Sequence, residues 1–183
     1  MDDSDAESLN LNNENQQKRS PKELFDEILK SLEEYTSEKV EVLLKNKSKF
    51  LSILKTHRPL KTADYHYGLS ENLLKDRALI VFEFDDKRMV RQYYKHTSGK
   101  NIWRCLKCKR LYINQLRSSI TSLYLINGIL LVPLDHDCTP RDAEIVMQYQ
   151  KFLEEGNMQL ARRMTQVVSF NFGESSLAYE CYQ

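Results

Sequence analysis

Three of the four cysteines in this 183-residue chain form one pattern with a histidine. Two residues lie between Cys105 and Cys108, as in a CxxC motif. Residues 109–135 separate this pair from His136 and Cys138. Close cysteines can turn towards one ion from a tight turn between strands, and side chains two apart on an extended chain share a face. Three thiolates and an imidazole form a tetrahedral zinc set that leaves no position for water. The pattern therefore predicts one structural Zn2+ ion, and a fold built around it.

Other interpretations of these cysteines stay open. A redox-active pair would lie where a strand runs into a helix, whereas Cys108 leads into Lys109 and an expected further strand. A disulfide is disfavoured because the acidic start MDDSDAESLN is neither a secretory signal nor a transit peptide. The pattern could also be a coincidence. We favour zinc because the two ligand pairs bracket a predicted hairpin, and we expect Cys181 to be a free thiol.

The chain between the ligand pairs predicts that hairpin. Asn127-Gly128 lies between two apolar runs, and a primed turn needs positive φ at both of its central residues. Upstream, β-rich runs predict further strands at 78–84, 88–95, 101–105 and 110–114. We therefore expect an α+β fold, with a small antiparallel sheet of four to five strands pinned by one zinc ion and flanked by N-terminal and C-terminal helices.

Two helix starts are recognisable. Ser20 can cap a helix with Pro21 at its first position and Glu23 reaching back to the cap. Thr139, with Asp142 three residues later, repeats this pattern. The expected buried stripes are Phe25, Ile28, Leu32 and Tyr35 in the first helix, and Ile145, Tyr149 and Phe152 in the second. The first stripe would either pack onto the rest of the chain or form a dimer contact.

Four regions follow from these patterns. Residues 1–19 are acidic and polar without an apolar stripe, so we expect a disordered tail. Residues 20–77 should form a helical N-terminal region, and residues 78–139 the zinc-bound sheet. Residues 140–183 should form a C-terminal helical region and a tail.

The net charge is only +1, but the basic residues are concentrated. Residues 87–117 contain ten Lys and Arg and no Asp or Glu, and such a block makes a local field that favours a polyanion. A sheet displaying cations among tyrosines would suit a nucleic-acid backbone, although a merely solvated basic face is the plainer interpretation. We expect Trp103 to anchor the core and not to stack on bases. The candidate DNA-contacting residues are Lys87, Arg88, Arg91, Lys95, Lys100, Arg104, Lys107, Lys109 and Arg110.

Around these residues the sequence resembles a FLYWCH-type zinc finger, a relative of the WRKY and GCM DNA-binding folds. The resemblance covers about residues 78–140, and the chain departs from the pattern at Cys138, where a histidine is more usual. The matching residues are Phe82 or Phe84, Tyr93 or Tyr94, Trp103, Cys105, Cys108 with Lys109, and His136. The resemblance implies a zinc-pinned antiparallel sheet that binds duplex DNA in the nucleus.

We therefore expect a zinc-dependent DNA-binding protein, a transcriptional regulator or transposon-derived factor, with double-stranded DNA as its partner. The alternative is a zinc-stabilised protein-protein interaction module without sequence-specific DNA binding, and either module could meet a protein through helices at 20–58 or 140–168. A closed ligand set argues against an enzyme. No membrane or nucleotide partner is expected, since no apolar run approaches the roughly 20 residues of a bilayer span and no phosphate-binding glycine motif occurs.

Overall fold

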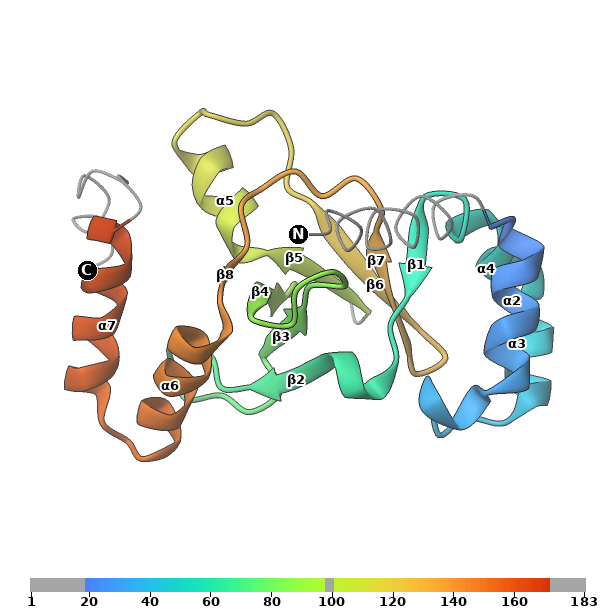
Figure 1. The fold of residues 1–183 in the computed structure, drawn as a ribbon, viewed down its shortest axis with the longest axis horizontal. Coiled ribbons are helices and arrows are strands. Elements are labelled where there is room, and N and C mark those ends of the chain that lie inside the picture. The colour runs from blue at the N-terminus through green and yellow to red at the C-terminus, as the bar shows by residue number, and fades with distance from the viewer. Residues whose placement is uncertain (1–18, 98–100, 172–183) are drawn as a thin grey trace, which may run out of the picture.

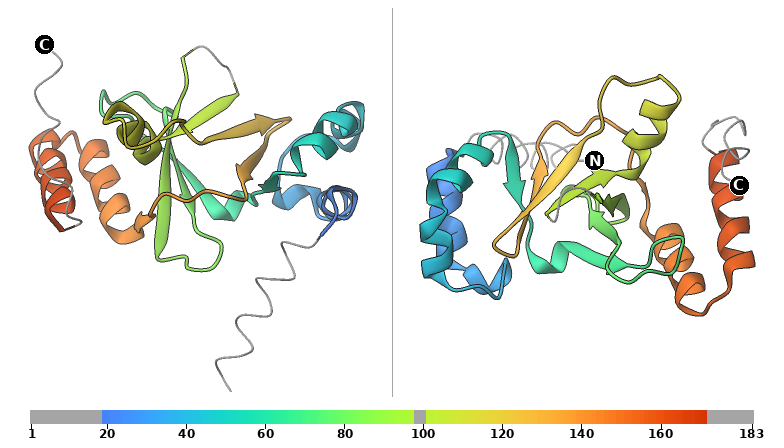
Figure 2. Two further views of the ribbon diagram at one scale, coloured as in Figure 1. Left: turned by 90° about the horizontal axis from the view of Figure 1, so that it is seen from above. Right: turned by 180° about the vertical axis from the view of Figure 1, so that it is seen from behind.

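One curled antiparallel sheet forms the centre of the protein, and helices lie at both of its ends (Figure 1, Figure 2). The computed structural model describes residues 19–97 and 101–171. Across the sheet the strand order is β1-β7-β6-β5-β4-β3-β2, and β8 pairs with the first residues of β4. The strands are β1 (His57–Pro59), β2 (Tyr65–Gly68), β3 (Ala78–Phe82), β4 (Met89–Lys95), β5 (Ile102–Cys105), β6 (Ser122–Ile126), β7 (Ile129–Pro133) and β8 (Arg141–Asp142).

The α+β class and the antiparallel sheet are confirmed, but the strand count is not. Within the described residues the sheet has eight strands, more than the expected four to five. The additional strands β1, β2 and β8 are too short to show an alternating pattern, and β1 ends in Pro59 while β2 ends in Gly68. Each of these strands is held by pairing with a longer strand: β1 pairs with β7, β2 with β3 and β8 with β4. Region 20–77 thus supplies both edges of the sheet as well as helices.

The capping box predicted at the first helix is present. The Glu23 backbone N–H donates to Ser20 Oγ at 3.3 Å, and the Ser20 N–H donates to Glu23 Oε2 at 2.7 Å. None of the helices in the described ranges is long and apolar enough to cross a membrane. The helices are α2 (Pro21–Lys30), α3 (Val40–Lys45), α4 (Lys47–Ile53), α5 (Leu106–Ile113), α6 (Ala143–Glu154) and α7 (Met158–Asn171), with short 3-10 turns η1 (Leu32–Glu34) and η2 (Thr62–Asp64).

The predicted hairpin joins β6 to β7. Asn127 and Gly128 have φ values of 48° and 74°, as a primed turn requires. A Cβ on Gly128 would lie 2.3 Å from Thr36 Oγ1, so the turn fits tightly against the segment after η1. Thr36 Oγ1 also donates to the Asn127 carbonyl at 3.1 Å, and Asn127 Nδ2 donates to the Val42 carbonyl at 3.1 Å. These bonds fix the N-terminal helices to the hairpin.

The two faces of the sheet bury different partners. Its concave inner face packs Leu79, Tyr93 and Trp103 around the cysteines, and Trp103 is buried as expected of a core anchor. On the outer face, Phe25 and Ile28 of α2 and Phe50 of α4 pack against β6 and β7, which places the N-terminal stripe within the chain. At the other end, α6 packs on the outer face of β3 and β4.

The start of the second predicted helix is wrong by a few residues. Arg141 and Asp142 pair with β4 as β8, so α6 begins at Ala143 with Asp142 as its cap, and Thr139 caps nothing. The buried stripe shifts by one position, because the strand pairing sets the angle at which the helix meets the sheet. The buried residues of α6 are Ala143, Val146, Gln150 and Leu153, in place of the predicted Ile145, Tyr149 and Phe152.

Candidate metal centre

The junction of β5 and α5 presents Cys105 and Cys108. Cys105 ends β5 with its side chain in the core, and its Sγ accepts a hydrogen bond from the Cys108 N–H at 3.4 Å. This bond caps α5, so the predicted strand at 110–114 is instead part of a helix over Leu106–Ile113. The run of Leu, Lys and Arg after Cys105 favours a helix once its first turn is capped. The cysteines therefore lie at a strand-to-helix junction, which removes one argument used against a redox pair.

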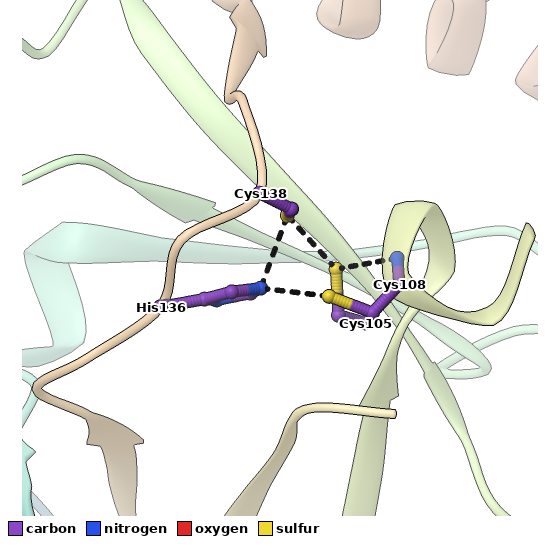
Figure 3. A group of neighbouring side chains, drawn as sticks. All are labelled: Cys105, Cys108, His136 and Cys138. Atoms are coloured by element: carbon purple, nitrogen blue, oxygen red, sulfur yellow. Dashed lines mark hydrogen bonds between the residues drawn. The ribbon is translucent and has the colours of Figure 1, made fainter. Parts of the chain in front are cut away.

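The second ligand pair comes from the loop between β7 and β8. His136 and Cys138 lie on this loop with both side chains turned towards the β5–α5 junction (Figure 3). The Sγ atoms of Cys105 and Cys138 are 3.6 Å apart. His136 Nε2 lies 3.3 Å from Cys108 Sγ and 3.1 Å from Cys138 Sγ. Four donor atoms from two distant segments thus converge on one point, which a two-cysteine redox site would not need.

The geometry of this cluster fits a metal ion. The four donor atoms all lie within 4.8 Å of one another. A tetrahedral ion with ordinary metal–sulfur and metal–nitrogen bonds would space sulfurs about 3.8 Å apart and place nitrogen about 3.5 Å from sulfur. Cys105, Cys108 and Cys138 are at most 5% exposed, and His136 is half-buried. The cluster of Cys105, Cys108, His136 and Cys138 could therefore hold one metal ion in a closed site.

The cysteines do not titrate alike without a metal. The hydrogen bond with Cys138 raises the pKa of Cys105, and burial raises it further. The same hydrogen bond lowers the pKa of Cys138, with His136 and Arg91 also favouring its thiolate. Cys138 is therefore already suited to bind a cation, and Cys105 would release its proton as the cation binds.

A hydrogen bond from β4 orients the histidine. The Tyr93 hydroxyl lies 3.0 Å from His136 Nδ1, and burial raises the pKa of Tyr93, so the phenol stays neutral. With Nε2 on a metal, Nδ1 carries the proton and donates to the Tyr93 oxygen. The β4–β5 register places Tyr93 directly opposite Cys105. Tyr93 is therefore positioned to fix both the tautomer and the ring plane of His136.

Replacing Tyr93 with Phe is expected to weaken metal binding about 10- to 100-fold, the usual effect of losing a hydrogen bond to a ligand. Competition with a chromogenic chelator measures this affinity. Tyr124→Phe on β6 removes the same hydroxyl away from the cluster and should leave the affinity unchanged. Equal affinities for both variants would show that Tyr93 does not orient the ligand.

Arg91 is the second support of the site. Its Nε donates to Glu83 Oε1 at 2.6 Å, and its Nη1 contacts Cys138 at both the carbonyl oxygen and, at 3.3 Å, the sulfur. Only 12% of its side chain is exposed. Arg91 therefore anchors the Cys138 backbone to β4, a role that the sequence did not suggest.

A second set of hydrogen bonds supports the cluster on the side of Cys108. Cys108 Sγ donates to Thr121 Oγ1 at 3.4 Å, and Arg117 donates to the same oxygen at 3.1 Å. Arg117 also forms an ion pair with Asp137, the residue between the two late ligands. This ion pair ties the loop that carries His136 and Cys138 to the segment between α5 and β6.

The candidate DNA-contacting residues do not form one surface. Lys87 forms an ion pair with Asp64, and Arg88 with Asp86. Lys95 lies with its Nζ 5.8 Å from the centre of the Trp103 ring, on the inner face with Arg91. Lys100 lies outside the described residues, as does Cys181.

A smaller group of the candidates lies together where β5 meets α5. Arg104 is opposite Tyr94 in the strand pairing, on the outer face of the sheet, and Lys109 Nζ lies 4.8 Å from the centre of the Tyr94 ring. Lys107 and Arg110 belong to the same helix as Lys109. We call Arg104, Lys107, Lys109 and Arg110 the corner cluster.

Comparison with known proteins leaves the site to be judged on its own geometry. No family model matches the chain, and neither does any of the curated proteins or solved structures with which it was compared.

Proposed function

We propose that the four-residue cluster binds one structural zinc ion. Soft thiolates with one imidazole are the donor set that zinc prefers in structural sites. The three cysteines of the cluster are buried. Protein atoms would fill all four coordination positions of a tetrahedral ion. A filled coordination sphere leaves no place for a substrate or an activated water, so the site is structural and the protein is not a zinc enzyme.

We further propose that the zinc-bound sheet binds duplex DNA, in the manner of the FLYWCH-type fingers that its sequence resembles. The observation that carries this proposal is the alternation of cations with ligands at the β5–α5 junction. Arg104 precedes Cys105, Lys107 precedes Cys108, and Lys109 and Arg110 follow. A zinc ion holding the two cysteines would fix the corner cluster on a rigid frame, ready for phosphate contacts.

A nuclear role as a transcriptional regulator or transposon-derived factor accords with such a module. Arg91 is left out of the proposed surface because it is buried against Glu83 and Cys138. Lys87 and Arg88 are neutralised locally by carboxylates and would add little to a DNA contact.

The test is selection of zinc-loaded protein against a random duplex DNA pool, followed by titration of the selected duplex over a range of salt concentrations. The affinity should fall steeply with salt, and Lys109→Gln should reduce the slope of log K against log salt by about one. Lys49→Gln, an exposed lysine of α4, is the matched control and should keep the slope. No enriched motif together with an unchanged slope for Lys109→Gln would contradict DNA binding.

A zinc-stabilised protein-interaction module is the second candidate, and one observation favours it. Tyr112, Ile113 and Leu116 are 49%, 62% and 73% exposed at the end of α5 and just beyond. Neighbouring exposed apolar side chains of this kind often mark a protein contact. Under this alternative, salt would barely affect partner binding, since apolar burial would dominate it.

A further inference from the structure

A second candidate site lies on the outer face of the sheet, away from the metal centre. A surface pocket of about 310 Å³ is lined by residues of β3, β4, β8, α5, α6 and α7 and of the turn after β2. Ligand pockets typically begin at about 300 Å³, so the space suits a small molecule. The metal ligands instead pack with the inner-face core, whose other members include Leu79 and Trp103. None of the four metal ligands lines the pocket, although Tyr93, which contacts His136, is part of its lining.

The charge of the pocket favours an anion. Four cations line it, namely Arg77, Lys109, Arg110 and Arg141, against two carboxylates, Glu71 and Asp142. One of those carboxylates has a structural role, because Asp142 Oδ1 accepts the Ile145 N–H as the cap of α6. Arg77 lies at the start of β3 and the other cations on β8 and α5, so positive charge reaches the pocket from more than one side.

The rest of the lining favours an apolar, aromatic body. Ile145 and Val146 of α6 and Met164 of α7 supply aliphatic and thioether surface. Tyr94 and Tyr149 add two aromatic rings from β4 and α6. Tyrosine rings interact well with other aromatic rings, and an apolar lining with a few charged groups is the usual composition of a small-molecule site.

We infer that this pocket binds a small organic anion with an aromatic body, its anionic group on the arginines and its ring among Tyr94, Tyr149 and the aliphatic residues of α6. The anionic group can be a carboxylate or a phosphate, because arginine recognises both in the same bidentate way. The pocket shares Lys109 and Arg110 with the corner cluster, but the inference can be tested apart from DNA binding through Arg77 and Ile145, which lie outside that cluster.

The experiment is a nuclear magnetic resonance titration of the zinc-loaded full chain with 2-naphthoate, with neutral 2-naphthalenemethanol and with 2-naphthyl phosphate. Saturable shifts of the amides of Gln92, Tyr94 and Tyr149 should appear with at least one anion. That anion should bind about tenfold or more tightly than the neutral alcohol, as one charge-assisted hydrogen bond would give. Comparison of the two anions distinguishes carboxylate from phosphate as the preferred group.

Two variants and a control locate the binding. Arg77→Gln removes an exposed cation of the lining, and Ile145→Trp fills the space without changing charge; each should weaken binding about tenfold. Lys151→Gln, on the outward side of α6, should bind as the parent protein does. Retained dispersion in the amide spectrum verifies folding of each variant. Absence of saturable binding, equal binding of the neutral alcohol, or unchanged binding by both lining variants would overturn the inference.

Discussion

Chelation of zinc under reducing conditions is expected to destabilise the sheet and to lower its melting temperature by at least about 10 °C. Structural zinc contributes on the order of 10 kcal/mol in small fingers, and 1 kcal/mol moves the melting temperature of a chain this size by about 2–4 °C. The four ligands join β5 and α5 to the loop between β7 and β8. Without the ion, three buried sulfurs and an imidazole would lose the partner that holds these segments together.

Circular dichroism melts of the zinc-loaded and chelated protein measure this effect. Cys108→Ser should behave like the chelated protein, whereas Cys181→Ser, at the remaining cysteine of the sequence, should keep both the zinc and the melting temperature. Identical melts with and without zinc would contradict a structural role for the metal.

Replacing Arg91 with Met is expected to destabilise the zinc-loaded protein by about 2–3 kcal/mol. Breaking a buried ion pair from one side commonly costs about 3–5 kcal/mol, and Glu83, which keeps 24% of its side chain exposed, moderates the loss. The Cys138 carbonyl would lose its arginine donor as well. Urea denaturation measures the change as a lower midpoint with an unchanged slope.

Two companion variants separate this effect from charge alone. Arg88→Met removes an arginine whose side chain is 87% exposed and which pairs with Asp86, so it should leave stability unchanged. Adding Glu83→Leu to Arg91→Met should recover part of the loss, because it removes the stranded carboxylate. If Arg91→Met and Arg88→Met are equally stable, Arg91 does not support the site.

The convergence of the metal-binding residues was predictable because each ligand pair is a local pattern and a recognisable turn lies between the two pairs. Asn127-Gly128 dictates a tight turn, and that turn folds the later ligands back towards the earlier ones. The conformation after Cys105 was less predictable, since Leu, Lys, Arg, Tyr and Ile suit either a strand or a helix. The Cys105 sulfur decides it by capping α5, and side-chain capping by cysteine has no strong sequence signature.

Long-range pairing accounts for the features that the sequence did not predict. The edge strands β1 and β2 form because they pair with β7 and β3. The composition of these two segments by itself is typical of a loop that connects other elements. The role of Arg91 depends on a carboxylate eight residues away and on a loop that returns to it much later in the chain. The block at 87–117 likewise appeared uniformly basic, but four of its cations pair with carboxylates from outside it, namely Asp64, Glu83, Asp86 and Asp137.

X-ray absorption at the zinc edge of the purified full-length chain tests the central claim most directly. The account predicts one zinc ion per chain, with three sulfur neighbours at about 2.3 Å and one nitrogen neighbour at about 2.0–2.1 Å. Cys138→His should change this to two sulfurs and two nitrogens if that residue is a ligand. A folded protein without stoichiometric zinc, or a zinc ion bound by fewer sulfurs with a water oxygen in the remaining position, would contradict it.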